Sequence, residues 1–273
     1  MSTKTKFITM ILAPLIAVTA FSADWPQYYG PSRDSTSTEK GLLRTWPNDG
    51  PKVLWTAPLG IGFGGPAVSA GKVYLLDRDD KVGDTLRVYD LSNGKELWNF
   101  AYAGPGKVEF PGSRSTPTVD GDRVYTVGMV GDLYCFSTPT QKPVWHKNIW
   151  TDFGGGSGVP ASPFAPPAAG GQLPIWGIVQ SPLIYRNLLI VASQAPQAGV
   201  VAYDKAPGDI GRSVGVNQIA GGPYPQPGFG EGLQDRVLLT DLFRSVFLHG
   251  RLQDVLQGLN PRLDDGEVGA QIS

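Results

Sequence analysis

The sequence predicts an all-β fold: a partial β-propeller of about three four-stranded blades, followed by an irregular or helical tail. Three observations predict it. The 273 residues include 36 Gly and 24 Pro, so turns are frequent. Charged residues make up 17% and aromatic residues 10%, a balance that excludes a disordered chain and a coiled coil. Most directly, one pattern of short β-branched and aromatic runs occurs three times.

The three repeats keep their internal spacing. Each repeat begins at a proline that lies seven residues before its second apolar run: Pro66 and Val73, Pro117 and Val124, Pro182 and Leu189. Nine residues separate a ring in the third run from a closing tryptophan in two repeats: Tyr89 and Trp98, Phe136 and Trp145. Four short strands in a unit of about 45 residues are typical of a propeller blade. A β-sandwich of short strands is the alternative, because strand spacing alone does not separate the two folds.

Turn residues separate the runs, as in Ala70-Gly71-Lys72, Asp120-Gly121-Asp122 and Ser92-Asn93-Gly94. Asn93-Gly94 suits a tight hairpin that requires positive φ. A single blade does not cover both faces of its sheet, so we expect the units to be stable only when stacked.

The pattern weakens toward the end of the chain. Nine residues after Tyr203 stands Arg212 in place of a closing tryptophan. Three repeats and the Leu54-Trp55 strand are also too few for a ring of about four to eight blades. We therefore expect an open sheet edge and an uncovered blade face, with marginal stability, self-association or a protein partner as the consequence.

The ends of the chain differ from the repeats. Residues 1–22 are typical of a signal peptide, with Lys4 and Lys6 before an apolar run and Ala20-Phe21-Ser22 before the cleavage point. This apolar run is short for a membrane span, so we expect no stable membrane insertion after cleavage. A retained membrane anchor is the alternative. This predicts a periplasmic or secreted protein with blades in residues 23–212. Residues 213–273 form an atypical tail, either helical or the product of a shifted reading frame.

Charge and composition narrow the classes of function. The formal net charge is −1 without a basic block, which argues against nucleic-acid binding. One cysteine and two histidines leave no internal disulfide and no multi-Cys or His-rich metal centre.

Several stretches resemble a known family in order along the chain. They are Asp24-Trp25-Pro26-Gln27-Tyr28-Tyr29-Gly30-Pro31, Leu54-Trp55, Gly112-Ser113-Arg114-Ser115-Thr116-Pro117, Trp176-Gly177-Ile178-Val179-Gln180-Ser181-Pro182 and Gly199-Val200-Val201-Ala202-Tyr203-Asp204-Lys205. The chain resembles the exported bacterial branch of the propellers built from pyrroloquinoline-quinone (PQQ)-type repeats, in truncated form. That family includes quinoprotein alcohol dehydrogenases and the outer-membrane assembly lipoprotein. The resemblance implies that Trp55, Trp98 and Trp145 pack between neighbouring blades.

A candidate ligand site comes from equivalent positions before the innermost strand of each repeat. They are Gly64 and Gly65, Arg114 and Ser115, and Gln180 and Ser181. Propeller loops converge there on the central channel, and Arg114 is suited to a carboxylate or another anion. The alternative is that these residues only cap strands.

Other polar residues favour structural interpretations. Asp77, Asp79, Asp80 and Asp84 lack the spacing of a calcium loop, and we expect a solvated hairpin. His146 has no acid beside it in sequence, so we interpret it as a surface or packing residue. Cys135 lies in an apolar run and is expected to be buried and inert.

No catalytic motif is present in the sequence, which favours an exported binding or scaffold module over an enzyme. The alternative is a degenerate or truncated PQQ-dependent oxidoreductase, and only then would PQQ and calcium be cofactors. Quinone-binding relatives commonly carry a disulfide of adjacent cysteines and an acidic–amide calcium site. A single cysteine excludes the first feature, and no convincing cluster provides the second.

Overall fold

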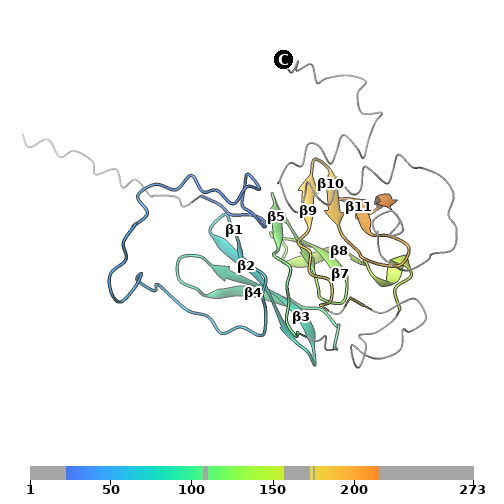
Figure 1. The fold of residues 1–273 in the computed structure, drawn as a ribbon, viewed down its shortest axis with the longest axis horizontal. Helices are drawn as coiled ribbons and strands as arrows, with labels where there is room; N and C mark the ends of the chain where they lie inside the picture. Colours follow the sequence, from blue (N-terminus) through green and yellow to red (C-terminus); the bar gives the residue numbers. More distant parts are fainter. Residues whose placement is uncertain (1–22, 107–109, 157–172, 175, 215–273) are drawn as a thin grey trace, which may run out of the picture.

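The described part of the chain is almost entirely β-sheet. The computed structural model describes residues 23–106, 110–156, 173–174 and 176–214. Within these ranges, twelve strands form three antiparallel four-stranded sheets, and one short 3₁₀ helix, η1 (Thr151–Phe153), follows the second sheet (Figure 1). The expectation of an all-β partial propeller of three blades is confirmed. The predicted signal peptide and the tail from residue 215 onward lie outside the described residues.

Each sheet is a meander of four consecutive strands. The first sheet contains β1 (Ala67–Ser69), β2 (Lys72–Asp79), β3 (Gly83–Asp90) and β4 (Glu96–Ala101). The second contains β5 (Thr118–Asp120), β6 (Arg123–Val127), β7 (Asp132–Ser137) and β8 (Lys142–Asn148). The third contains β9 (Leu183–Tyr185), β10 (Leu188–Val191), β11 (Val200–Asp204) and β12 (Ile210–Val214). The third sheet is thus a complete blade, whose last strand extends two residues past the predicted boundary at 212.

The same irregularity occurs in all three sheets. The register between the third and fourth strands shifts at Val88/Tyr89, Cys135/Phe136 and Ala202/Tyr203. The turns that follow contain a residue of positive φ, namely Gly94 (71°), Gln141 (58°) and Gly208 (75°). A recurrent bulge of this kind increases the local twist and re-aims the fourth strand. The sequence repeat is therefore also a repeat of backbone geometry.

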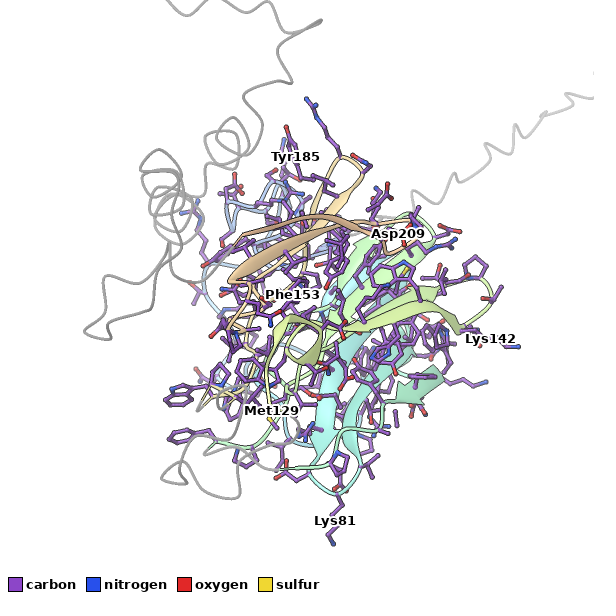
Figure 2. The ribbon with its side chains drawn as sticks, turned by 90° about the vertical axis from the view of Figure 1, so that its right-hand side faces the viewer. Lys81, Met129, Lys142, Phe153, Tyr185 and Asp209 are labelled. Carbon is purple, nitrogen blue, oxygen red and sulfur yellow. The ribbon has the colours of Figure 1, made fainter. Side chains whose placement is uncertain are left out.

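Apolar side chains fill the spaces between consecutive sheets. Between the first and second sheets, Leu86, Val88 and Phe136 are completely buried. Between the second and third sheets, the buried cluster includes Cys135 and Val201, each 0% exposed. Side chains lie between the sheets throughout, with Lys81 and Lys142 at the periphery (Figure 2).

Tryptophans at the blade ends contact the following sheet. The Trp145 indole N–H donates to the carbonyl of Lys205 (3.2 Å), and a Cβ built on Gly208 would lie 2.6 Å from the ring. Trp98 lies against Phe136 of the second sheet, with ring centroids 6.0 Å apart. A glycine at position 208 therefore makes room for the ring of Trp145, since any side chain there would collide with it.

The innermost strands connect the three sheets near the propeller axis. The Phe63 N–H donates to Ser113 O (2.6 Å), and the Thr118 hydroxyl donates to Pro182 O (2.6 Å). The Thr116 N–H donates to Ser181 Oγ (3.0 Å). These bonds fix the relative positions of segments that lie about 50 to 65 residues apart in the sequence.

Apolar side chains on the outer face of the third sheet are also buried. In the third sheet, Ile190, Ala192 and Val200 alternate with the residues that face the second sheet, and all three are at most 9% exposed. Beside the first sheet, the segment before β1 forms a wide loop that brings Trp55 against Tyr89 (Figure 1). No helix in the described ranges is long and apolar enough to cross a bilayer.

We predict that Trp145→Ala lowers the free energy of unfolding by about 3 kcal/mol, because it removes most of the apolar contact between the second and third sheets at this point. Urea denaturation followed by circular dichroism measures the change. Val144→Ala is the matched control, since Val144 precedes it on β8 and is 45% exposed, and it should cost less than about 1 kcal/mol. Equal losses in the two variants would show that the indole does not hold the sheets together.

Candidate functional site

A pocket lies where the segments leading into the inner strands converge. Its volume is about 380 Å³, and it is lined by Phe63, Arg114, Pro174, Trp176, Gly177, Val179 and Gln194. The lining residues come from the approaches to β1, β5 and β9 and from the loop after β10. All three blades therefore contribute to it, and a volume of this size is in the range of small-ligand sites.

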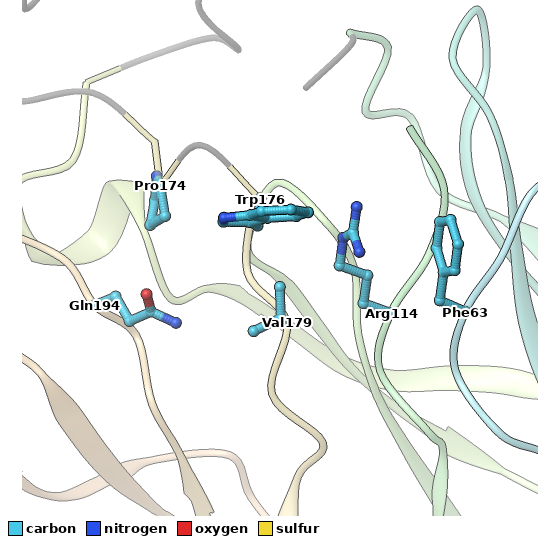
Figure 3. Close-up of a pocket in the computed structure, with 7 residues that line it drawn as sticks. Phe63, Arg114, Pro174, Trp176, Val179 and Gln194 are labelled. Atoms are coloured by element: carbon cyan, nitrogen blue, oxygen red, sulfur yellow. The ribbon is translucent and has the colours of Figure 1, made fainter. Parts of the chain in front are cut away.

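Arg114 lies between two aromatic rings at the rim. Its guanidinium carbon is 4.8 Å from the Phe63 ring centroid and 5.3 Å from that of Trp176. The Trp176 ring stacks in turn on Phe110, with centroids 4.3 Å apart and planes 6° apart. Figure 3 shows Trp176, Arg114 and Phe63 side by side. Cation–π contacts on both sides hold the guanidinium in one orientation.

The hydrogen bonds of Arg114 are incomplete. Its Nη2 donates to the carbonyl of Phe110, while its Nε is buried with no hydrogen-bond partner in the described part of the chain. Burial lowers the pKa of Arg114 from its ordinary value, but a guanidinium stays protonated at neutral pH. A cation held in one orientation beside a pocket is suited to an anionic group.

Two glycines allow the backbones around the pocket to approach closely. A Cβ on Gly64 would collide with the backbone carbonyl of Ser115, so only glycine lets the Phe63 segment lie against the Arg114 segment. Gly177 has φ of 71°, and a Cβ there would lie 2.6 Å from Cγ of Met129. The next residue, Ile178, donates its N–H to Met129 O (2.8 Å), which holds the chain after Trp176 on the second sheet.

Of the six residues predicted as a ligand site, Arg114 is the one found among the described lining residues. Gly64 lies behind the rim against Ser115, and Gly65 is exposed. Ser115 is buried, with its hydroxyl 3.5 Å from Thr116 O. Ser181 accepts the Thr116 N–H, so it joins inner strands, and Gln180 is half-buried outside the lining.

Sequence reasoning missed Phe63, Trp176, Val179 and Gln194 as lining residues. Three of them adjoin or belong to stretches with a sequence signal: Phe63 precedes Gly64, and Trp176 and Val179 belong to a run matched to the family. The signal in the sequence was an aromatic residue directly before a glycine, and the structure shows that both rings are exposed. Phe63 is 64% exposed and Trp176 is 47% exposed, unusual values for large rings.

Two of the four acidic residues in the first hairpin are buried, whereas the sequence suggested a solvated loop; Asp79 at the end of β2 is exposed. Asp77 is 2% exposed and Asp84 is 1% exposed, and both lie on strands rather than in the turn. Asp77 pairs with Arg87 (2.6 Å), and Asp84 pairs with Arg78 (2.8 Å). A carboxylate is rarely buried without a cation beside it, and an arginine stands beside each of these two.

Asp84 connects the first sheet to the second. Its side chain accepts hydrogen bonds from the Ser113 hydroxyl and from the Met129 N–H (2.9 Å) as well as from Arg78. Arg78 also donates to the carbonyls of Gly104 and Gly106, both at 2.7 Å. Burial raises the pKa of Asp84, whereas these three donors act in the opposite direction. The network fixes Ser113, the second residue before the ligand-site candidate Ser115.

His146 has an acidic partner, contrary to the expectation from sequence. Its Nε2 lies 3.0 Å from Asp132 Oδ1, and its ring stacks on Tyr134 with centroids 4.2 Å apart. Asp132 is fourteen residues away in sequence but lies on the neighbouring strand β7, which explains why spacing along the chain did not reveal it.

The described residues offer no ready site for calcium. No group of three His, Cys, Asp or Glu side chains gathers closely enough within these ranges to hold a metal ion. The buried carboxylates of Asp84 and Asp132 are already engaged by Arg78, Ser113, His146 and their neighbours.

A sequence model of a protein family, described as "Outer membrane protein assembly factor BamB", matches residues 32–158 and 83–211, which together span more than half of the chain. The chain belongs to this family. It has the PQQ-type repeat propeller fold that the three sheets display. A search among curated proteins finds no match.

Solved structures that the chain matches include a BamB and two dehydrogenases. BamB from Moraxella catarrhalis is 16% identical, with 59% of this chain and 39% of that chain covered and a TM-score of 0.38. Quinohemoprotein alcohol dehydrogenase from Comamonas testosteroni is 17% identical, with 68% and 26% covered and a TM-score of 0.42. A europium-containing methanol dehydrogenase is 15% identical, with 58% and 26% covered and a TM-score of 0.41. The chain thus spans well under half the length of these proteins.

We predict that Asp84→Asn lowers the free energy of unfolding by about 3 kcal/mol, because it removes the buried counter-ion of Arg78 and leaves only the more exposed Asp80, 3.1 Å from Arg78 Nε. Chemical denaturation measures the loss. Asp79→Asn is the control: Asp79 is exposed at the end of β2, and its substitution should cost less than about 0.5 kcal/mol. A wild-type stability for Asp84→Asn would mean that the network does not bind the two sheets.

We also predict that Cys135 in the folded protein does not react with a thiol reagent at pH 8. Burial raises the pKa of the Cys135 thiol to about 11, so the thiolate fraction at pH 8 is about a thousandth. The pKa of this thiol is near 8.5 in the unfolded chain and about 11 in the folded protein. The free energy of unfolding therefore falls as the pH rises from about 8.5 through about 11. Colorimetric titration with and without denaturant tests this. Rapid reaction of the native protein would contradict the buried position of the thiol.

Proposed function

We propose that this chain is an exported binding module and not an enzyme, and that the pocket at Arg114 binds a carboxylate on an extended polypeptide partner. The observation that carries the proposal is the guanidinium held between Phe63 and Trp176 at the rim of the pocket. A guanidinium oriented in advance loses little side-chain entropy when it binds a carboxylate.

The surroundings of Arg114 favour a peptide over a small polar metabolite. Phe63, Phe110 and Trp176 are each at least 45% exposed around the cation. Aromatic residues and arginine are the residue types enriched at the centres of protein interfaces. Apolar side chains of a partner would cover these rings while its carboxylate meets Arg114.

Export supports the same proposal. Residues 1–22 have the pattern of a signal peptide, and the family description names an outer-membrane assembly factor. The description gives the family as an assembly factor of outer membrane proteins, and a binding or scaffold role for this chain is part of our proposal.

The test uses a short acidic peptide, acetyl-Gly-Phe-Glu-Phe-Gly-amide, measured by isothermal titration calorimetry. We expect binding that weakens about tenfold in Arg114→Gln, because a charge-assisted hydrogen bond is lost. The control peptide has glutamine in place of glutamate. Its affinity for the wild type should be no higher than the affinity of the acidic peptide for Arg114→Gln.

The control variant is Arg186→Gln, which removes another arginine that lies over an aromatic ring, 5.3 Å from the centroid of Tyr185, on the turn before β10. It should leave the affinity unchanged. Equal binding of the acidic and neutral peptides would overturn the role of Arg114. Reconstitution with PQQ and calcium, followed by dye reduction on a panel of alcohols, tests the competing oxidoreductase function, and turnover there would overturn the non-enzymatic proposal.

A further inference from the structure

The loop between β10 and β11 carries a glutamine to the candidate pocket. This loop spans residues 192–199, whereas the equivalent connections of the other two sheets span only residues 80–82 and 128–131. Gln194 is the residue of the loop that lines the pocket. The third blade therefore adds a polar side chain to the site through a connection that is shorter in the other two blades.

Hydrogen bonds hold this loop in one shape. The Gln194 N–H donates to Gly199 O (3.3 Å), and the buried Ser193 hydroxyl also donates within the loop. The Gln197 N–H donates to Phe153 O (3.0 Å), which attaches the loop to η1. The backbone that carries Gln194 is thus fixed by its own contacts, as a precise binding group requires.

The backbone of Gln194 itself is left-handed. Its φ is 54°, a region in which the Cβ of a residue such as glutamine is crowded. Among the described residues other than glycine that have positive φ, Gln194 is the one that lines the pocket. Glycine at this position would relieve the crowding but would remove the side chain. A strained residue on a pocket wall indicates that its side chain has a use there.

The amide of Gln194 and the guanidinium of Arg114 belong to different parts of the pocket. In Figure 3, Trp176 and Val179 lie between these two polar side chains. The wall between them is therefore apolar. Where most of a pocket wall is apolar, its few polar groups fix the orientation of the ligand.

We infer that Gln194 is a specificity-determining residue of this pocket, and that it binds a main-chain peptide group of the partner whose carboxylate binds Arg114. The inference rests on the proposed function and adds the chemical group that the second polar side chain takes. A side-chain amide has one carbonyl acceptor and an N–H donor, so it matches the acceptor and the donor of a peptide group.

Two separated polar contacts select for the length of the ligand. A small carboxylate reaches Arg114 without crossing Trp176. An extended chain rises about 3.3 Å per residue, so a few residues carry a peptide group across the apolar wall to Gln194. Main-chain hydrogen bonds give affinity that does not depend on the partner's side chains. The pocket therefore recognises one acidic residue together with the extended backbone beside it.

The test uses acetyl-Gly-Phe-Glu-Phe-Gly-amide and isothermal titration calorimetry. Gln194→Met nearly keeps the length of the side chain and removes its hydrogen-bonding groups, so we expect binding to weaken about fivefold. Gln197→Met is the matched control, because Gln197 belongs to the same loop but its side chain lies against Gly154. It should leave the affinity unchanged.

The outcomes separate this inference from the proposed function. Unchanged affinity in Gln194→Met, together with weaker binding in Arg114→Gln, would overturn the inference and leave the proposed function standing. Equal losses in Gln194→Met and Gln197→Met would also overturn it. Failure of the wild type to bind the peptide would overturn both.

A second peptide separates main-chain contacts from side-chain contacts. In acetyl-Gly-Ala-Glu-Ala-Gly-amide, alanine replaces both phenylalanines, so we measure its weaker binding by NMR titration at millimolar peptide. The wild type should still bind about fivefold more tightly than Gln194→Met, since the peptide groups are unchanged. Equal binding of this peptide by the two proteins would show that Gln194 contacts a phenylalanine and would overturn the main-chain contact.

A third variant separates a role in the loop from a role in binding. Gln194→Gly should melt no lower than the wild type, because glycine adopts a φ of 54° without crowding. It should bind the first peptide as weakly as Gln194→Met does. Wild-type affinity in Gln194→Gly would overturn the inference. A melting temperature several degrees below that of the wild type would overturn it as well, because the side chain would then support the loop.

Discussion

Stacking of sheets that are apolar on both faces is the constraint on which this structure depends. A four-stranded blade of about 45 residues has too little interior of its own, so its stability comes from the contact with the next blade. In this chain the contact has two parts: a layer of buried aliphatic and aromatic residues, and a tryptophan from one blade that docks on the turn of the next. The glycine in that turn is what gives the indole its place.

Buried polar interactions set the blades in register where apolar packing alone would not. Asp84 joins a strand of the first sheet to Ser113 and Met129 of the second, and Arg78 satisfies its charge. Hydrogen bonds have direction, whereas apolar contacts tolerate small rotations. The Arg78–Asp84 network therefore fixes the approach to β5, and with it the position of Arg114 on the pocket rim.

The candidate site arises from segments that lead into the strands rather than from the strands themselves. The blades provide rigid edges, and the approaches to β1, β5 and β9 carry Phe63, Arg114 and Trp176 to one place. This division is common in repeat folds, in which the packed units bear the stability and the connecting segments vary. The family membership specifies the packed units, and the proposed ligand depends on the connecting segments.

The sequence by itself determined the repeat, the strands and their turns, because alternation of apolar residues and turn chemistry are local properties. It also identified Trp55, Trp98 and Trp145 through the family resemblance, and Arg114 through its place before an inner strand. Only the tertiary structure decided that Asp77 and Asp84 are buried beside arginines, and that Asp132 is the partner of His146. It likewise brought Phe63 and Trp176 to Arg114. These contacts join residues on different strands or blades, and their distances depend on how the sheets stack, which no local pattern encodes.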